Sequence, residues 1–248
     1  MVSVAAIIQA RMGSTRFPGK SLHPIAGIPL LEHIIIRLQQ VSEIDSIILA
    51  IPDNDTNAPL LEFAHRLHVP VVQGSEEDVL GRFIKAGESV QAEHIIRVCG
   101  DNPLIDTPLL RSLISAHLQA KADYTLPHEP VPLGSSCEII RLETLKQISA
   151  LTEDSIYREH VTTWFHDHPT SFCIKRVNAP HYLRDQNFRL TVDTDRDFQL
   201  MEALFKNLPH SPSSPLNLEA VINYLINHPK TTALNIDIAQ NNWREKNI

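Results

Sequence analysis

The chain opens on an apolar run, VSVAAIIQ at residues 2–9, which leads into the polar, glycine-containing stretch ARMGSTRFPGK at residues 10–20. An apolar run of this length, followed directly by polar residues and glycine, is typical of a strand buried on both faces. Pro29 then precedes LLEHIIIRLQQV at residues 30–41, whose apolar positions recur at helical spacing. The first forty residues therefore predict a buried strand, a polar loop and an amphipathic helix.

The alternation of strands and helices continues through the first half of the chain. Further apolar runs of strand length lie at 46–51, 69–73 and 94–98, and helical patterns lie at 58–68, 75–90 and 108–120. Ser75 followed by Asp78 predicts a capping box for the helix at 75–90. Such alternation indicates a doubly wound α/β fold, in which helices cover both faces of a mostly parallel sheet.

Parallel strands place their carboxyl ends at one edge of a sheet, where doubly wound folds bind their ligands. The loops that follow the first four strands lie at 10–20, 52–57, 73–78 and 99–106. We therefore expect these four loops to line one edge together and to carry the functional site.

The second half of the chain is less regular. Residues 127–136, PHEPVPLGSS, form a proline-rich loop. Strand patterns lie at 137–141, 172–177 and 189–192, helical patterns at 154–166, 196–206 and 218–227, and a hinge at 211–215. We interpret residues 1–248 as a single domain, in which 124–188 form a smaller, irregular α+β excursion and 234–248 a loose polar tail.

The composition is that of a globular protein. Of the 248 residues 43% are hydrophobic, which is enough for a core and excludes a mostly disordered chain. Lys and Arg number 22 against 29 Asp and Glu, giving a net charge of −7. An acidic chain is not expected to bind nucleic acid in general, although a local basic pocket for a small anion remains possible.

The sequence also predicts where the protein resides. It contains no apolar run long enough for a membrane helix, and its N-terminus lacks the basic region and cleavage site of a signal peptide. The three cysteines, Cys99, Cys137 and Cys173, fit neither a disulfide framework nor a zinc site. We therefore expect a cytoplasmic protein that does not associate with membranes.

The loop at 10–20 has the composition of a triphosphate site. It contains three cations, two hydroxyls and two glycines: Arg11, Arg16, Lys20, Ser14, Thr15, Gly13 and Gly19. Glycines let backbone N–H groups approach phosphate closely, and the cations supply fixed positive charge. A Walker A loop is disfavoured because five residues rather than four separate Gly13 from Gly19, and a G-x-G-x-x-G fingerprint is absent. A solvated basic surface loop, the alternative, accounts less well for this density of phosphate-binding groups directly after a strand.

The segment QARMGSTRFPGK at 9–20 resembles the N-terminal signature of the cytidylyltransferases that activate sugar acids, the family of CMP-Kdo and CMP-sialic acid synthetases. The resemblance is strongest to the branch called spore coat polysaccharide biosynthesis protein F. It recurs in GSEEDVLGRF (74–83), RVCGDNPLID (97–106), YREHVT (157–162) and RLTVDTDRDF (189–198). It implies a Rossmann-like nucleotide-diphospho-sugar transferase fold, CTP as a substrate, Mg²⁺ as cofactor and a homodimer.

The resemblance also implies a role for each matching residue. Catalysis would rest on Arg11, Lys20, Asp101 and Asp193. The cations Arg11, Arg16 and Lys20 would hold the β- and γ-phosphates of CTP, and the two aspartates would bind Mg²⁺. Further nucleotide contacts would come from Ala10, Gly13, Ser14, Arg82 and Cys99, and acceptor contacts from Glu138, Arg158, Glu159 and His160. Cys99 departs from the family pattern, because CMP-Kdo synthetases usually carry glutamine there, in contact with the nucleotide.

The acidic residues also have other interpretations. A turn or helix-cap role is the alternative for Asp101, and Asp106, which precedes Thr107 and Pro108, is better placed to cap a helix. The aspartates at 193, 195 and 197 have calcium-loop spacing, but Phe198 and Leu204 stand where an EF-hand needs glycine and glutamate. We expect Asp195 and Asp197 to cap the following helix.

The predicted reaction is an in-line attack of an acceptor oxygen on the α-phosphorus of CTP, with pyrophosphate as the leaving group. The resemblance implies a 2-keto-3-deoxy sugar acid as the acceptor and cell-surface polysaccharide biosynthesis as the context. Two rivals remain open. Asp193-Thr-Asp195 matches the D-x-D metal motif of nucleotide-sugar glycosyltransferases, and a non-catalytic relative would bind a nucleotide without turning it over.

The homodimer implied by the resemblance has one physical argument in the sequence. The excursion at 124–188 carries five aromatic residues, Tyr157, Trp164, Phe165, Phe172 and Tyr182. Because Trp164 and Phe165 are adjacent on a predicted helix, one of them should face away from the local core, where exposed aromatic surface favours an interface.

Overall fold

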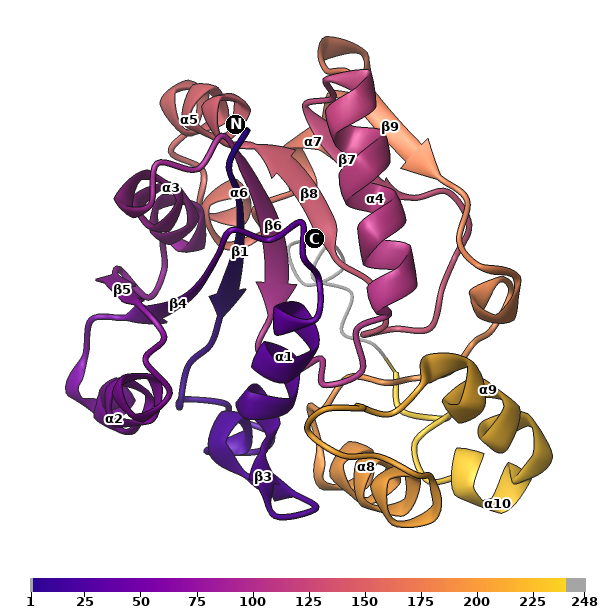
Figure 1. Cartoon of the computed structure of the whole chain (residues 1–248). Coiled ribbons are helices and arrows are strands. Elements are labelled where there is room, and N and C mark those ends of the chain that lie inside the picture. Colours follow the sequence, from indigo (N-terminus) through magenta and orange to yellow (C-terminus); the bar gives the residue numbers. More distant parts are fainter. Residues whose placement is uncertain (1, 240–248) are drawn as a thin grey trace.

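The structure, a computed structural model, describes residues 2–239, and these contain one seven-stranded sheet (Figure 1). Its strands are β1 (Val4–Gln9), β4 (Ser46–Pro52), β5 (Val71–Gly74), β6 (His94–Cys99), β7 (Tyr124–Pro127), β8 (Glu138–Arg141) and β9 (Ile174–Val177). They lie in the order β5-β4-β1-β6-β8-β7-β9, and β8 alone runs against the others. The predicted mostly parallel α/β fold is confirmed.

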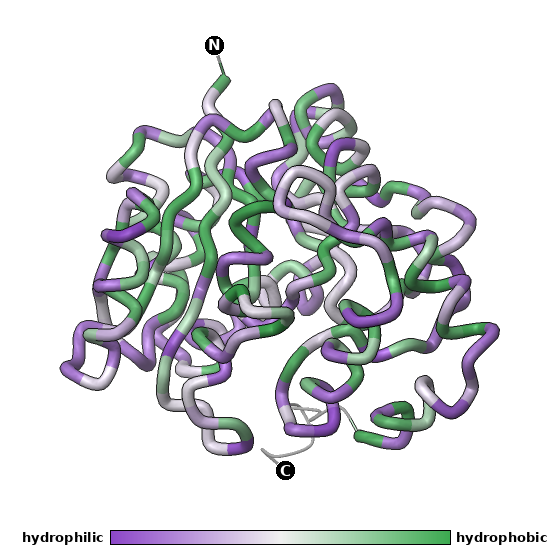
Figure 2. Tube along the Cα trace, turned by 60° about the horizontal axis from the view of Figure 1, so that its bottom comes forward, coloured by the Kyte–Doolittle hydropathy of each residue, from purple (hydrophilic) through white to green (hydrophobic). Residues whose placement is uncertain are grey.

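Helices cover both faces of this sheet. The helices of the described chain are α1 (Leu30–Gln39), α2 (Ala58–Arg66), α3 (Val79–Ser89), α4 (Thr107–Ala120), α5 (Leu142–Leu151), α6 (Ser155–Glu159), α7 (Thr163–Asp167), α8 (Asp195–Asn207), α9 (Leu218–Asn227) and α10 (Pro229–Thr232). Of these, α6 and α10 are short and bury no residue. One core cluster joins α1, α2, α4, α8 and α9 to the sheet, and a second joins α3, α5 and α7 to its other face. Figure 2 shows the apolar segments concentrated inside and the polar ones on outer loops. Within residues 2–239 no helix is long and apolar enough to cross a membrane.

The segment expected to form an irregular excursion contributes more to the sheet than we predicted. Strands β7, β8 and β9 all come from it and extend the sheet beyond β6. The predicted helix at 154–166 is two short helices, α6 and α7, because the chain leaves helical geometry at His160 and turns Val161 and Thr162 inward. A short antiparallel pair, β2 (Pro24–Ile25) and β3 (Ile28–Pro29), was not expected.

Three further expectations about local structure were wrong. Asp78 is the N-cap of α3 and accepts from Gly81 N at 2.8 Å. Ser75 Oγ does accept from Asp78 N at 3.4 Å, but α3 begins only at Val79, so this contact does not form a capping box for the helix. Residues 189–192 form one isolated bridge instead of a strand, because their backbone groups bond to neighbouring loops. The 211–215 segment is a tight turn closed by the pairing of Ser211 with Ser214.

The expected loose tail, residues 234–248, contains a buried residue near its start. Asn235 is 1% exposed, and its side chain donates to Arg189 O at 3.0 Å and to Asp197 Oδ1 at 2.8 Å. The chain is therefore anchored to the body of the domain at this point. Residues 240–248, the rest of the expected tail, lie outside the described residues.

A buried histidine pair makes the fold sensitive to acid. His117 on α4 is 0% exposed and lies 2.9 Å from His94 on β6 and 2.7 Å from Thr125 Oγ1 on β7. Burial, and then His94, lowers the pKa of His117 from 6.5 to about 3. As the pH falls below 6.5, the unfolded chain binds a proton here that the folded chain does not.

Titration of His117 should therefore lower the free energy of unfolding by up to about 1.4 kcal/mol for each unit by which the pH falls. Denaturant titrations between pH 7 and pH 4 test this, with His117→Gln as the variant that removes the titrating ring. We expect the variant to lose stability less steeply on acidification. Parallel curves for the two proteins would show that the histidine is not the source.

Candidate active site

The carboxyl ends of β1 and β6 open into a cavity of about 600 Å³. Most residues predicted for the site line it: Ala10, Arg11, Ser14, Arg16, Lys20, Arg82, Cys99, Asp101, Glu159, His160 and Asp193. In the described chain Gly13, Glu138 and Arg158 do not line it, whereas Thr15 of the predicted triphosphate loop does. Six further residues line the cavity without having been predicted as site residues: Gln9, Ser21, Glu76, Val79, Arg97 and Gly100. The 10–20, 73–78 and 99–106 loops share this edge as expected. The 52–57 loop contacts the 10–20 loop through Asn57, which accepts from Met12 N at 2.9 Å.

The first and fourth loops meet because a glycine lets their backbones touch. Gly100 N donates to Gln9 O at 2.8 Å, and a Cβ at Gly100 would lie only 2.7 Å from that oxygen and 2.9 Å from Ala10 Cβ. Only glycine fits such a contact without a shift of the backbone. Asp101 is thereby placed directly beside the 10–20 loop.

The loop after Asp101 is fixed from below by a buried arginine. Arg37 on α1 is 5% exposed and donates to three carbonyls: Pro103 at 2.8 Å, Ile105 at 3.2 Å and Leu216 at 2.6 Å. Burial lowers its pKa to about 10, which still leaves it charged at neutral pH. Asp106 caps α4 as predicted, accepting from Leu109 N at 2.8 Å.

Backbone hydrogen bonds between loops bring Asp193 next to Asp101. Leu190 N donates to Leu133 O at 2.7 Å and Val192 N to Asp101 O at 2.8 Å. Gly134, at φ +90°, allows this approach, because a Cβ there would lie 2.8 Å from the Leu190 carbonyl carbon. The extended segment, rather than the expected strand, therefore carries Asp193 to Asp101.

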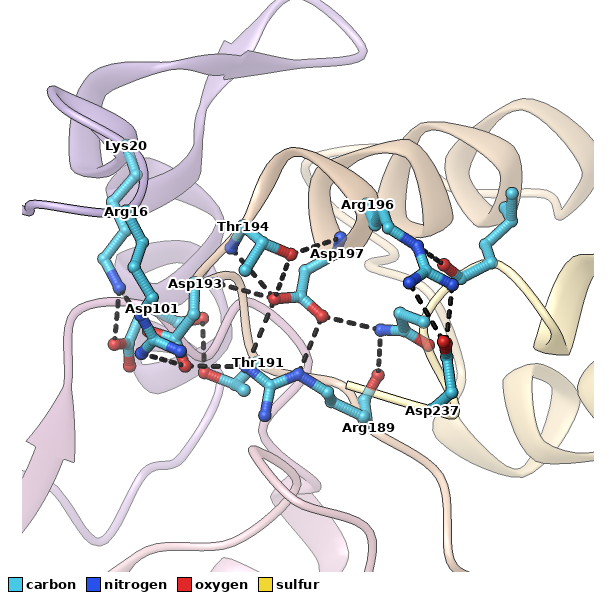
Figure 3. Close-up of polar contacts among 12 residues, drawn as sticks. Arg16, Lys20, Asp101, Arg189, Thr191, Asp193, Thr194, Arg196, Asp197 and Asp237 are labelled. Carbon is cyan, nitrogen blue, oxygen red and sulfur yellow. Dashed lines mark hydrogen bonds and ion pairs between the residues drawn. The ribbon is translucent and has the colours of Figure 1, made fainter. Parts of the chain in front are cut away.

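A buried ion pair holds the start of α8 behind Asp193. Asp197 is 0% exposed and accepts from Arg189 Nε at 2.8 Å, and its other oxygen accepts from Asp193 N at 3.0 Å (Figure 3). Asp197 forms a capping box with Thr194, which confirms its expected capping role. Asp195 does not cap; its carboxylate accepts from Gln199 on the surface at 2.6 Å.

Lys20 lies between the two candidate metal ligands. Its Nζ is 2.9 Å from Asp101 Oδ2 and 2.7 Å from Asp193 Oδ1, and its side chain is 12% exposed (Figure 3). Arg16 and Arg189 approach the other oxygen of Asp193 at 3.2 and 2.8 Å. Burial alone would lower the pKa of Lys20, but the two carboxylates raise it above its usual value. Burial would likewise raise the pKa of Asp193, and Lys20 and then Arg16 hold it below the usual range.

The pair of carboxylates fits a divalent cation. Two oxygens from different segments converge on a single ammonium nitrogen, so a cation already occupies the space between them. In residues 2–239 no group of three or more acidic, histidine or cysteine side chains gathers as a metal site. An ion held here would need phosphate and water oxygens to complete its shell, which is how Mg²⁺ usually binds in nucleotide sites.

The cavity wall on the α3 side is built from the 74–77 loop. Arg82 is 5% exposed, and its Nη1 donates to the carbonyls of Ser75 and Glu76, the second at 3.1 Å. Glu76 in turn pairs with Arg11 at 3.2 Å and accepts from Asn54 at 2.9 Å. Arg82 therefore shapes the loop as well as lining the cavity.

Cys99 is poorly suited to act as a nucleophile. Burial raises the pKa of its thiol to about 11, so the thiol stays protonated at neutral pH. This agrees with the expectation that in-line transfer needs no covalent intermediate on the protein.

Two of the predicted acceptor residues do not line the cavity and are bonded to other side chains. Arg158 donates to Ser149 and Glu153 at 2.8 and 2.9 Å. Glu138 accepts from Arg97 at 2.8 Å, from Thr162 at 3.3 Å and from the Tyr124 hydroxyl. Arg97 itself lines the cavity, although sequence reasoning passed over it.

Comparison with known proteins identifies the family of this chain. The model of the cytidylyltransferase family matches residues 5–242. Spore coat polysaccharide biosynthesis protein SpsF of Bacillus subtilis (strain 168) is 37% identical over 218 residues, 86% of this chain and 90% of SpsF. A cytidylyltransferase structure from Leptospira borgpetersenii has a TM-score of 0.87 at 24% identity, covering 97% of this chain and 100% of that one.

The structure of CMP:2-keto-3-deoxy-manno-octonic acid synthetase complexed with CTP has a TM-score of 0.63 at 19% identity, covering 82% of this chain and 98% of that one. It shares the fold. The family match spans nearly the whole chain and includes every segment that reaches the cavity. The chain therefore belongs to the cytidylyltransferase family of nucleotidyltransferase enzymes.

Proposed function

We propose that this enzyme transfers CMP from CTP to a hydroxyl of a 2-keto-3-deoxy sugar acid, releases pyrophosphate and serves cell-surface polysaccharide biosynthesis. The observation that carries the proposal is the meeting of Lys20 with Asp101 and Asp193, within 2.9 Å, inside a cavity at the carboxyl edge of the sheet. The names of the relatives, SpsF and the CTP-bound synthetase, support the context and the nucleotide. Its three cysteines are unpaired, which supports a place in the reducing cytoplasm.

The chain's own groups account for binding of the triphosphate. Arg11, Arg16 and Lys20 all come from the 10–20 loop and line the cavity. They would contact the β- and γ-phosphates, so that charge developing on the leaving pyrophosphate meets fixed cations. Arg189, which is 6% exposed at its side chain, stays on Asp193 and fixes the orientation of that carboxylate.

Asp101 and Asp193 would hold Mg²⁺, which when bound neutralises phosphate charge and lowers the pKa of a coordinated hydroxyl. Lys20 would then give up its contacts with the aspartates and remain available to the distal phosphates. Positioning and electrostatics suffice for the reaction, since the protonated Cys99 offers no nucleophile.

The geometry disfavours both rivals. A D-x-D metal site would need Asp195 beside Asp193, but Asp195 bonds to Gln199 and is not among the described residues that line the cavity. A non-catalytic nucleotide binder would have no need of the two converging carboxylates, since each costs desolvation energy. Asp101 and Asp193 both contact Lys20, which supports the catalytic interpretation.

A pyrophosphate-release assay tests the proposed function. CTP, UTP, ATP and GTP are each combined with Mg²⁺ and with 3-deoxy-manno-octulosonate, N-acetylneuraminate or a neutral hexose. We expect release that requires both CTP and a sugar acid. Release with any nucleotide, or turnover of a nucleotide sugar without pyrophosphate, contradicts the proposal.

We further propose that the enzyme is a homodimer and that the region around α7 forms part of the contact. Phe165 is buried and stacks on Tyr124 with ring centroids 4.6 Å apart, whereas Trp164 is only half-buried and stacks on His168 at 4.2 Å. Trp164 is thus the more exposed of the two adjacent aromatics, although it also packs against the core cluster beneath α3 and α5.

Light scattering at micromolar concentration should give twice the chain mass of 27.9 kDa, and Trp164→Glu should shift the protein toward the monomer. A monomeric wild type would refute the dimer. A dimer that survives Trp164→Glu would place the interface elsewhere.

A further inference from the structure

Arg97 is a partly buried cation that lines the cavity. It lies on β6 two residues before Cys99, about 7 Å further from the edge of the sheet. Its side chain is 21% exposed, and Nη1 donates to Glu138 Oε2 on the neighbouring strand β8 at 2.8 Å. Glu138 also accepts from the hydroxyls of Tyr124 and Thr162. Glu138 therefore pairs with Arg97 and is itself held in place by two hydroxyls.

Arg97 keeps donors that the protein does not satisfy. Its Nε is buried without a hydrogen-bond partner among residues 2–239, and so are Gln9 Oε1 on β1 and the Nε of Arg82. Arg82 differs from Arg97 in that its Nη1 is bound to the 74–77 loop. Arg97 and Gln9 line the same cavity, and Gln9 pairs in register with Cys99. Buried polar groups are rarely left unpaired, so an unpaired donor and an unpaired acceptor in one cavity call for a ligand that supplies both partners.

Packing does not explain why a cation occupies this position. Ile95, two residues earlier on the same face of β6, is 0% exposed in the core cluster beneath α3 and α5. An apolar residue at 97 would continue that cluster, and replacing a buried ion pair by apolar residues is often neutral or stabilising. The Arg97–Glu138 pair is therefore retained for what it binds.

We propose that Arg97, oriented by Glu138, binds the carboxylate of the acceptor, and that Gln9 accepts a hydrogen bond from one of its hydroxyls. Because Glu138 takes Nη1, the Nε and Nη2 groups remain, and these form the edge of a guanidinium that binds a carboxylate through two hydrogen bonds. The other cations of the cavity belong to the 10–20 loop and to Arg82, so Arg97 is the one set apart among its described residues.

Glu159 and His160 line the same cavity as Arg97. Burial lowers the pKa of His160, so this side chain is mostly neutral at neutral pH and adds no second positive charge. The single positive charge of one guanidinium matches the charge of a monocarboxylate better than that of a phosphate group. The inference rests on the proposed function, since it names the recognition group for that acceptor.

The test separates the acceptor from the nucleotide. CTP affinity with Mg²⁺ is measured by calorimetry, and the KM for 3-deoxy-manno-octulosonate and N-acetylneuraminate by pyrophosphate release. Arg97→Gln should raise the KM for the sugar acid by roughly 10- to 150-fold, as expected for a lost charged hydrogen bond, and leave CTP affinity unchanged. Arg97→Lys should recover part of the loss, because it keeps the charge but not the paired donors.

Two controls keep a structural effect apart from a binding effect. Arg97→Gln with Glu138→Gln replaces the ion pair by two amides, so it should unfold near the wild-type temperature and still show the raised KM. Arg111→Gln removes a surface arginine that pairs with Glu43 at 2.8 Å and should change neither quantity. If the double variant binds the sugar acid normally, or if CTP affinity falls as much as acceptor affinity, Arg97 does not recognise the acceptor.

The outcomes also separate this inference from the proposed function. If the wild type binds CTP but neither binds nor turns over a sugar acid, the assignment of Arg97 fails and the nucleotide site stands. If the wild type does not bind CTP, the proposed function fails. In that case calorimetry with 3-deoxy-manno-octulosonate alone, on the wild type and on Arg97→Gln, tests the carboxylate site independently. Equal binding by the two proteins, or no binding by the wild type, would overturn the assignment of Arg97.

Discussion

Asp101→Asn should reduce the rate of CTP-dependent pyrophosphate release by about 10³-fold or more while the protein stays folded. Asparagine has the shape of aspartate but loses the charge that a divalent cation needs. The backbone should not move, because Asp101 O still accepts from Val192 N and Arg37 still holds the loop at Pro103 and Ile105. The side chain gives up only its ion pair with Lys20.

The matched control is Asp195→Asn. This aspartate lies two residues from Asp193 and bonds to Gln199 on the surface, so its charge should not affect the rate. Thermal unfolding of both variants checks the fold, and Mn²⁺ binding in the presence of CTP checks the metal site directly. Near-normal activity of Asp101→Asn at saturating Mg²⁺ would falsify the metal assignment, and an equal loss in Asp195→Asn would revive the D-x-D interpretation.

Lys20→Ala should weaken CTP binding by roughly 10- to 100-fold and CMP binding far less. The proposed contact of this ammonium is to the distal phosphates, which CMP lacks. In the free protein the same ammonium neutralises Asp101 and Asp193, so the variant should also unfold at a lower temperature. The three effects together distinguish Lys20 from a cation that merely lies on the surface.

Calorimetric titrations with CTP and with CMP measure this difference. Lys206→Ala, at an exposed position near the end of α8, removes a positive charge away from the cavity and serves as the control. Equal weakening of CTP and CMP would move Lys20 from the distal phosphates to the nucleoside end of the ligand.

The fold was predictable wherever strand and helix alternate regularly. Buried runs such as β1 and β4, each followed by an amphipathic helix, define a parallel sheet because both faces must be covered. The strand pairing of the second half could not be predicted from such alternation. Strand β7 is four residues long and ends in Pro127, and its partners β8 and β9 are distant in sequence, so no local pattern marks their pairing.

The site was predictable to the extent that it depends on strand ends. Lys20 and Asp101 follow β1 and β6, which are neighbours in the sheet, so their meeting follows from topology. Asp193 was expected from the resemblance, but the strand predicted to carry it at 189–192 was wrong, since hydrogen bonds to loops hold this segment. Such contacts depend on tertiary packing that the sequence does not display.

Side-chain partners were the least accessible feature. Glu138 was expected to contact the acceptor, but it faces Arg97, and the pairing of β6 with β8 that joins them is not visible in the sequence. Arg97 did leave a signal. It is a charged residue inside an otherwise apolar strand, at a position that alternation places on the same face as Ile95. Charges at such positions are costly and mark candidate binding groups.

The most direct test of the nucleotidyl transfer follows the phosphorus atoms of CTP. The enzyme is incubated with Mg²⁺ and a sugar acid, and with CTP labelled in one experiment at the α-phosphate and in another at the γ-phosphate. We expect the α-label in a sugar nucleotide and the γ-label in pyrophosphate, with neither product formed by Asp101→Asn. A γ-label found on the acceptor or in inorganic phosphate, or an α-label that never reaches the acceptor, would contradict CMP transfer at this site.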